Sequence, residues 1–257
     1  MTPSTRAFYD HLADEYHLIF GDWEQAVRRQ GKVLEGLLCS KMGAGRLSIL
    51  DCSCGIGTQA IGLALRGHEL TATDVSPESV KRAKREAERF GVQIAFGVAD
   101  FRALEERVEG SFDVVISCDN ALPHMLSHED LLLAARSIRS RLRPGGLLLA
   151  SIRDYDSIVR ERPRSTMPSV FDSPEGKRIY FQAWDWEDDG RTYTVHLFLV
   201  RETGGHWEVR HHETHYRAVL RAELENVFEE AGFGDVAWHM PADSGYYQPI
   251  ITARRRR

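Results

Sequence analysis

Three acidic residues each follow an apolar run directly, and two glycines come shortly after the first of them. The runs end in Asp51, Asp74 and Asp100, and the glycines are Gly55 and Gly57. An apolar run, a glycine turn and a helical pattern predict a strand–turn–helix unit in which the backbone approaches a ligand closely and the helix supplies free N–H groups. A carboxylate at the end of the next strand can accept hydrogen bonds from ribose hydroxyls. The pattern therefore predicts a nucleoside site, against the alternative of a tight turn without a ligand.

The charge of these acids indicates which nucleoside fits. Dinucleotide dehydrogenases use the same turn, but a carboxylate at Asp51 would repel a pyrophosphate and attract a ligand that carries an ammonium and a sulfonium group. Asp100 can accept a hydrogen bond from an adenine amino group. The sequence shows no basic partner for a phosphate around these acids, so we expect a cationic nucleoside.

The elements that position these acids alternate between strand and helix from residue 47 to residue 152, and again from 217 to the end of the chain. We expect an α/β fold with a doubly wound, mostly parallel seven-stranded sheet. Between them, three apolar, aromatic-rich segments separated by DDG and TGG predict an inserted antiparallel β meander. We expect four units: an N-terminal helical lid, a cofactor-binding core, a substrate cap, and a completion of the core with a basic tail (1–42, 43–152, 153–216 and 217–257).

Composition narrows the class of protein. The 257 residues are 42% hydrophobic with a net charge of −5, which is ordinary for a globular protein and unlike a general nucleic-acid binder. The terminal arginines 254–257 are expected to form a solvated tail. Four cysteines without CxxC spacing, no apolar run of about 20 residues and no signal-peptide pattern lead us to expect a cytoplasmic protein without membrane contact.

The motifs resemble those of the class I S-adenosylmethionine-dependent methyltransferases. ILDCSCGIG resembles their first motif, TATDVSPESV the second and VADFRAL the third, and FDVVISCDNALPHM and LRPGGLLLAS resemble the two that follow. The resemblance implies S-adenosylmethionine as cofactor. It places ten residues in the cofactor site: Asp51, Cys54, Gly55, Gly57, Thr58, Asp74, Val75, Asp100, Phe101 and Cys118.

Within this class the chain resembles the glycine and sarcosine N-methyltransferase branch, through FYDHLADEYHLIFGDW, CDNALPHM and IRDYDSIV. The resemblance implies a small-molecule amine as substrate and is compatible with a homo-oligomer. It also implies that Asn120 and Arg153 bind the carboxylate of the substrate. It further implies that Arg28, or alternatively Arg29, binds the methionyl carboxylate of the cofactor. In that branch, tyrosines line the substrate pocket. The positions that correspond to these tyrosines lie near Phe181 and Phe198 in this chain.

Several of these residues also have a structural reading. Arg153 could instead form a surface salt bridge with Asp154 or Asp156. His124 could be a base, a cofactor contact or a packing residue. Tyr9 and Trp23 could contact the cofactor or only anchor the lid; for Tyr16, packing of the N-terminal helix is the preferred reading.

The histidines near the end of the meander do not predict a metal site. In a strand, His211 and His215 share one face, while His206 and His212 take the other. No set of two histidines and a carboxylate converges, so we expect an exposed cluster on an edge strand and no metal.

The sequence thus favours a methyltransferase acting on the amine of an amino acid or a related small molecule. Two alternatives stay open: an NAD-dependent oxidoreductase, and a non-catalytic module that binds S-adenosylmethionine. Methyl transfer needs no obligate acid or base, because its catalysis rests on alignment of the reactants.

Overall fold

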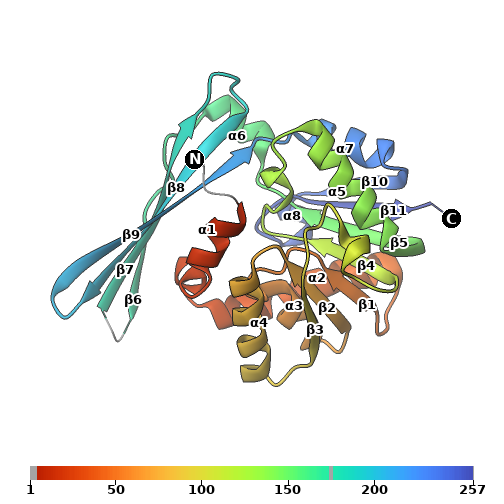
Figure 1. Ribbon diagram of the computed structural model, residues 1–257, viewed down its shortest axis with the longest axis horizontal. Coiled ribbons are helices and arrows are strands. Elements are labelled where there is room, and N and C mark those ends of the chain that lie inside the picture. Colours follow the sequence, from red (N-terminus) through yellow and green to blue (C-terminus); the bar gives the residue numbers. More distant parts are fainter. Residues whose placement is uncertain (1–4, 174–175, 257) are drawn as a thin grey trace.

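A seven-stranded sheet organises most of the chain in the computed structural model, which describes residues 5–173 and 176–256 (Figure 1). The strand order is β10-β11-β5-β4-β1-β2-β3; β1 to β5 pair in parallel, and β11 is antiparallel to both β5 and β10. This arrangement confirms the predicted fold class. The strands are β1 (Ser48–Asp51), β2 (Glu69–Asp74), β3 (Ile94–Val98), β4 (Phe112–Ser117), β5 (Leu142–Ser151), β10 (Phe233–His239) and β11 (Ile250–Arg255).

Helices cover both faces of this sheet. On one face, Leu34 and Leu38 of one helix pack against Ile49 of β1; on the other face, Phe228 packs in the cluster that contains Leu50 of the same strand. Neighbouring residues of a strand point to opposite faces, which is why β1 is apolar on both sides. The helices around this sheet are α2 (Trp23–Met42), α3 (Thr58–Ala64), α4 (Pro77–Arg89), α5 (His128–Ser140) and α7 (Arg221–Glu230).

The contact between α2 and α3 is unusually close because each helix contributes a glycine. A Cβ atom built on Gly31 would lie 2.4 Å from the carbonyl oxygen of Gly62, and one built on Gly62 would lie 2.6 Å from the carbonyl oxygen of Val27. The two glycines let α2 pack tightly against the helix that follows the glycine turn.

A separate four-stranded antiparallel sheet projects from the core (Figure 1). Its three long strands match the predicted meander, but the sequence did not reveal its first strand or the helix before it, because neither has a clear apolar period. The elements are α6 (Tyr155–Glu161), β6 (Ser169–Ser173), β7 (Gly176–Trp186), β8 (Thr192–Thr203) and β9 (His206–Arg217), in the order β6-β7-β8-β9. The strand β9 forms an edge, as expected; the division into units stays a prediction.

The N-terminal helix α1 (Thr5–Leu12) lies between the two sheets in Figure 1. Phe8 and Leu12 pack against Leu197 and Leu199 of β8, and Asp10 accepts a hydrogen bond of 2.6 Å from the Ser76 hydroxyl at the start of α4. The helix therefore joins the projecting sheet to the core. The short helices are η1 (Tyr16–Ile19), η2 (Leu104–Glu106), η3 (Leu122–His124) and α8 (Pro241–Ser244).

Two of the four C-terminal arginines, Arg254 and Arg255, are not part of the predicted solvated tail. Arg254 and Arg255 belong to β11, and their guanidinium groups donate to main-chain carbonyls, among them Gly145 and Leu142. They pair with those carbonyls because β11 lies between two strands. Residue 257 lies outside the described residues.

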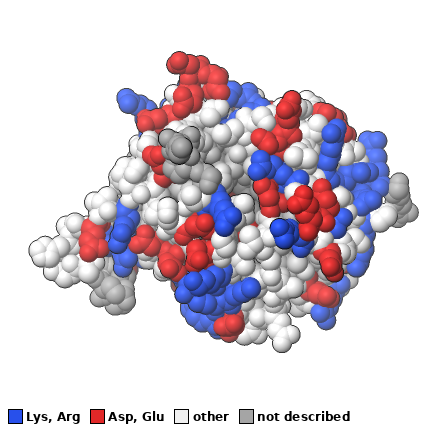
Figure 2. Space-filling view, in the orientation of Figure 1, with Lys and Arg blue, Asp and Glu red and all other residues white. Residues whose placement is uncertain are grey.

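The surface seen in Figure 2 carries acidic and basic side chains side by side, with Lys and Arg gathered over α4. None of the helices in the described part of the chain has the length and hydropathy needed to span a bilayer. The expectations that the chain binds no nucleic acid and lies in the cytoplasm remain predictions.

Candidate functional site

The glycine turn connects the ends of β1 and β2. Gly55 and Gly57 have φ angles of +52° and +95°, which favour glycine, and the Gly55 N–H donates to Asp74 at 2.8 Å. The other carboxylate oxygen of Asp74 accepts from the Ser76 N–H at 2.9 Å. Burial raises the pKa of Asp74 to about 6, opposed by these two amides. One carboxylate thus holds both loops at the carboxyl ends of the strands, where ligands bind in such sheets.

Asp51 is a buried carboxylate with an unsatisfied oxygen. Its Oδ1 accepts only a long contact of 3.3 Å from the Ser53 N–H, and its Oδ2 has no hydrogen-bond partner among the described residues. Burial raises the pKa of Asp51 to about 8, and the neighbouring charge of Asp74 raises it further. Such a group gains from a cationic or hydrogen-bond-donating partner.

A cavity of about 160 Å³ opens at this turn. A Cβ atom on Gly55 would meet nothing within 4 Å, so the backbone there borders open space. Burial raises the pKa of the two predicted thiols that line the cavity, Cys54 and Cys118, so both stay protonated and act as small apolar walls. The predicted residues that line the cavity are Tyr9, Cys54, Gly55, Thr58, Asp74, Val75, Asp100, Phe101, Cys118 and His124.

Four predicted cofactor residues do not line this cavity. Asp51 is buried at the end of β1, directly before the turn, and Gly57 caps α3 at its end, so both hold the turn without lining the cavity. Trp23 is buried and donates to the Thr58 hydroxyl at 3.0 Å, which fits the anchoring alternative. Arg28 is exposed and its guanidinium lies 5.7 Å from the Phe90 ring centre.

The prediction of Arg28 is therefore not supported by the geometry. Its neighbour Arg29 lines a second cavity instead, because one residue along a helix turns the side chain by about 100°. The sequence alone offered both arginines and no basis for choosing between them.

The expectation of acids without a basic neighbour is wrong at Asp100. Arg102 binds both oxygens of Asp100, with a shortest contact of 2.6 Å, and also reaches Asp130 at 3.0 Å. These contacts lower the pKa of Asp100 despite the opposing effect of burial. Arg102 lines the cavity, but its charge is matched by two carboxylates, so no uncompensated cation is offered to a pyrophosphate.

Three features of the described residues fit S-adenosylmethionine. The orphaned carboxylate oxygen of Asp51 suits a cationic group, Asp74 retains lone pairs toward the cavity, and the bare backbone at Gly55 leaves room for a ligand. The remaining lining residues were not assigned to the cofactor site from the sequence, although most of them lie within the quoted motifs, because a motif does not show which of its side chains face the cavity: Thr5, Tyr16, Cys52, Ser53, Ile56, Gln59, Arg102, Asp119, Ala121 and Met125.

A second cavity, of about 370 Å³, lies between the lid, the core and the inner face of the projecting sheet. Tyr9, Tyr16 and Asp119 line both cavities and join them. Asp119 accepts from the Gln59 amide at 2.7 Å and from the Tyr246 hydroxyl at 2.8 Å, while burial raises its pKa. This carboxylate at the junction was not predicted.

Arg153 projects into the second cavity together with Asn120. Its guanidinium donates to the Tyr193 hydroxyl and to Gln182 Oε1, each at 3.1 Å, and lies 5.0 Å from the Trp184 ring centre. The Arg153 N–H donates to Asn120 Oδ1 at 3.1 Å. All guanidinium partners that the structure describes are neutral.

The alternative of a salt bridge from Arg153 to Asp154 or Asp156 is wrong. Both of these carboxylates bind Arg221, at 2.7 Å and 3.5 Å. Within the described chain, Arg153 has no acidic partner, and a half-buried guanidinium without one favours an anionic ligand.

His124 connects three parts of the molecule. Its Nδ1 lies 3.1 Å from the His215 carbonyl oxygen, which can only accept, so Nε2 accepts from the Tyr9 hydroxyl at 2.9 Å. Burial lowers the pKa of His124 to about 3, and its ring lies 4.2 Å from that of Tyr216. A neutral imidazole with both nitrogens engaged is a poor base, so the geometry favours a positioning role.

The phenylalanines at the branch's tyrosine positions do not line the acceptor cavity. Phe181 and Phe198 stack at 4.9 Å on the outer face of the projecting sheet, while Tyr180 and Gln182 take the inner face. A strand alternates its side chains, so the expected correspondence is off by one residue.

The expectation that no metal-ligand set converges is also contradicted. His196 of β8 lies beside His211 and Glu213 of β9, and these three can offer ligand atoms within 4.8 Å of one another. The sequence prediction considered only histidines that now lie in β9. It left out His196, because the contact between His196 and His211 joins two different strands.

Comparisons with known proteins agree with this geometry. Residues 49–146 match the family described as "Methyltransferase domain". A glycine/sarcosine N-methyltransferase of Halorhodospira halochloris is 26% identical over 206 residues, covering 77% of this chain and 75% of the relative. Glycine N-methyltransferase of Homo sapiens is 30% identical over 181 residues, covering 65% of this chain and 57% of the relative.

The solved structures give the same fold. The S-adenosylmethionine-bound amino pentose methyltransferase CalS10 of Micromonospora echinaspora aligns with a TM-score of 0.72 and 14% identity, over 89% of this chain and 91% of that one. Together with the glycine turn and the two strand-end acids, the matching domain and these relatives support a class I S-adenosylmethionine-dependent methyltransferase.

Proposed function

We propose that the chain transfers a methyl group to the amine of a small molecule that also carries a carboxylate, such as glycine, sarcosine or a larger amino acid. The observation that carries the proposal is Arg153, a half-buried cation without an acidic partner in the second cavity. The names of the sequence relatives support an amino-acid acceptor.

Arg153 would hold the acceptor carboxylate by a two-pronged contact, with Asn120 fixing the backbone beneath it. Bound S-adenosylmethionine would supply the electrophilic methyl group. Tyr9 and Tyr16, which line both cavities, would align the acceptor and exclude water, and alignment of this kind is worth about 7–11 kcal/mol.

Asp119 is the residue we assign to the amine. An ammonium has no lone pair, so the acceptor must lose a proton before it reacts. A carboxylate whose pKa is raised by burial is a better proton acceptor than an exposed one, and Asp119 lies at the junction of the cavities. Glycine would thus be held at both ends, by Arg153 and Asp119.

A second acceptor class has its own support. Hydroxyl and amide groups of Tyr180, Gln182, Tyr247 and Gln248 line the same cavity, and they suit an acceptor with several hydroxyl groups. The structural neighbour named an amino pentose methyltransferase fits that reading.

Transfer of labelled methyl groups to matched acceptors tests the proposal. Glycine, sarcosine and larger amino acids are compared with glycinamide and ethanolamine, which keep the amine and lack the carboxylate, and with an amino sugar. We expect the carboxylates to be preferred at least about 100-fold, which a charged contact can supply. Equal rates with glycinamide would overturn the carboxylate assignment, and faster reaction of the amino sugar would favour the second class.

A further inference from the structure

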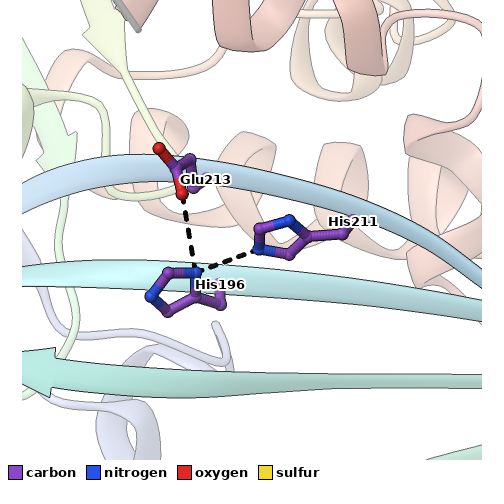
Figure 3. Close-up of side chains that lie close together, drawn as sticks. All are labelled: His196, His211 and Glu213. Carbon is purple, nitrogen blue, oxygen red and sulfur yellow. Dashed lines mark hydrogen bonds and ion pairs between the residues drawn. The ribbon is translucent and has the colours of Figure 1, made fainter. Parts of the chain in front are cut away.

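The outer face of the projecting sheet brings together two imidazoles and a carboxylate from two adjacent strands (Figure 3). His196 of β8 pairs across the strands with Glu213 of β9, and His211 lies two residues before Glu213 on the same face. His196 Nδ1 lies 3.0 Å from His211 Nε2 and 3.7 Å from Glu213 Oε2. The three groups point at one another because strand register fixes their positions.

A fourth residue orients the central imidazole. Asp185 of β7 lies 3.1 Å from His196 Nε2. A carboxylate accepts hydrogen bonds, so His196 carries its proton on Nε2 and directs the lone pair of Nδ1 toward His211 and Glu213. Carboxylates that hold the outer nitrogen of a ligating histidine in this way are a regular feature of metal sites.

The second imidazole is supported by aromatic stacking. The ring of His211 stacks on Phe198 at 4.9 Å and on His196 at 5.2 Å, and Phe198 in turn stacks on Phe181. To present a lone pair from Nε2, His211 needs only to carry its proton on Nδ1. No net charge change is required.

We propose that His196 Nδ1, His211 Nε2 and a Glu213 carboxylate oxygen bind one Zn²⁺, with Asp185 as the positioning residue. A tetrahedral Zn²⁺ about 2.0–2.1 Å from each ligand places neighbouring ligand atoms about 3.3 Å apart. Two of the three pairs of ligand atoms are separated by 3.0 and 3.7 Å, on either side of that value, and all three atoms lie within 4.8 Å of one another. Two imidazoles with one carboxylate suit zinc better than magnesium or calcium.

The site is open to solvent and separate from the methyl-transfer cavities. The His196 side chain is 24% exposed and that of Glu213 is 39% exposed, so an ion and a water can reach them. The cavity-lining residues of β7 and β8, Tyr180, Gln182, Val195 and Leu197, occupy the opposite face. The ion would link the edge strand β9 to β8 and thereby stiffen the sheet that carries the inner face.

Isothermal titration of the whole chain with Zn²⁺ in a non-chelating buffer tests this site. We expect one equivalent to bind, His211→Ala and Glu213→Gln each to weaken binding at least about tenfold, and Asp185→Asn to weaken it by about 10-fold. Two variants serve as controls and should bind as the parent does. His206→Ala removes an exposed histidine of the same strand, and Cys39→Ser removes a partly exposed thiol.

A second readout covers variants that fold poorly. Co²⁺ in place of Zn²⁺ should give the intense visible bands of a tetrahedral site, and Zn²⁺ should raise the melting temperature of the parent and of His206→Ala. Both effects should be absent in His211→Ala. Failure of the parent to bind Zn²⁺, or equal binding by the parent, His211→Ala and Glu213→Gln, would overturn the proposal.

Discussion

The two cavities share a wall and are built in different ways. The cofactor cavity is built around main chain: Gly55 and the loop after β2 are fixed by hydrogen bonds to one carboxylate, Asp74. The acceptor cavity is made of side chains from the lid, α2, the core loops and three strands of the projecting sheet, β7, β8 and β9. Backbone-built sites tolerate few changes of geometry, whereas a side-chain-built site can change its ligand by substitution. The contrast implies that variants should affect one cavity and spare the other.

Arg153→Met is expected to give the largest difference between the effects on the two cavities. Removal of the cation should lower kcat/KM for a carboxylate acceptor about 10³-fold, as expected when a buried ion pair to a ligand is lost. Binding of S-adenosylmethionine, measured by calorimetry, should change less than about threefold. Arg29→Met is the matched control at the same cavity and should cost much less, because Arg29 is exposed. A parallel loss of cofactor affinity in Arg153→Met would contradict the expectation that a variant affects one cavity and spares the other.

The complementary change is Asp74→Ala. Without this carboxylate the N–H groups of Gly55 and Ser76 lose their acceptor, and the ribose hydroxyls lose theirs. Affinity for S-adenosylmethionine should fall about 100-fold, because two hydrogen bonds to the charged Asp74 carboxylate are lost. At saturating cofactor the preference for glycine over glycinamide should persist, and its disappearance would show that the cavities are not independent.

The pH dependence of cofactor binding sharpens the comparison further. Asp51, with a pKa of about 8 in the free protein, is mainly protonated at pH 6 and should lose its proton when a cationic ligand occupies the adjacent cavity. Affinity should therefore rise with pH, by at most about 50-fold from pH 6 to pH 8 if the bound pKa falls below 6. Titrations in buffers of different ionisation enthalpy should show proton release at pH 7.

The Asp51→Asn variant provides the control for this pH effect. It should bind the cofactor with little pH dependence above pH 7, while a residual rise near pH 6 would belong to Asp74, whose pKa is about 6. An unchanged pH profile in Asp51→Asn would exclude Asp51 as the titrating group.

The smallest effect is expected at Phe181. Because its side chain stacks on the outer face, Phe181→Tyr should change kcat/KM for any acceptor less than about twofold. The inner-face change Tyr180→Phe removes a hydroxyl that lines the acceptor cavity and should cost more. A larger effect at Phe181 than at Tyr180 would mean that the assignment of faces is wrong.

The sequence predicted what is local and missed what depends on register. The glycine turn and the strand-end acids follow from spacing alone, and so does the seven-stranded sheet. Tyr180 and Gln182 could not be placed, because a shift of one residue along a strand exchanges its two faces. His196 and His211 are 15 residues apart and meet only through strand pairing.

Segments whose hydrophobic residues show only a weak periodicity were the second kind of region that the sequence did not predict. The helix α6 and the strand β6 lie in a polar, proline-containing stretch whose local pattern favours neither state. Arg254 and Arg255 look like a free tail in sequence, yet tertiary pairing with main-chain carbonyls draws them into β11. In each case the deciding interactions are distant in sequence.

The hydrogen bond from Tyr9 to His124 has a kinetic consequence. Tyr9 on α1 forms part of both cavities, so one segment blocks the exits of both ligands. Departure of α1 would open both at once, so the demethylated nucleoside and the methylated acceptor should escape at a common rate. Stopped-flow release of the two products from Tyr9→Phe should accelerate together, and acceleration of only one would indicate a separate exit.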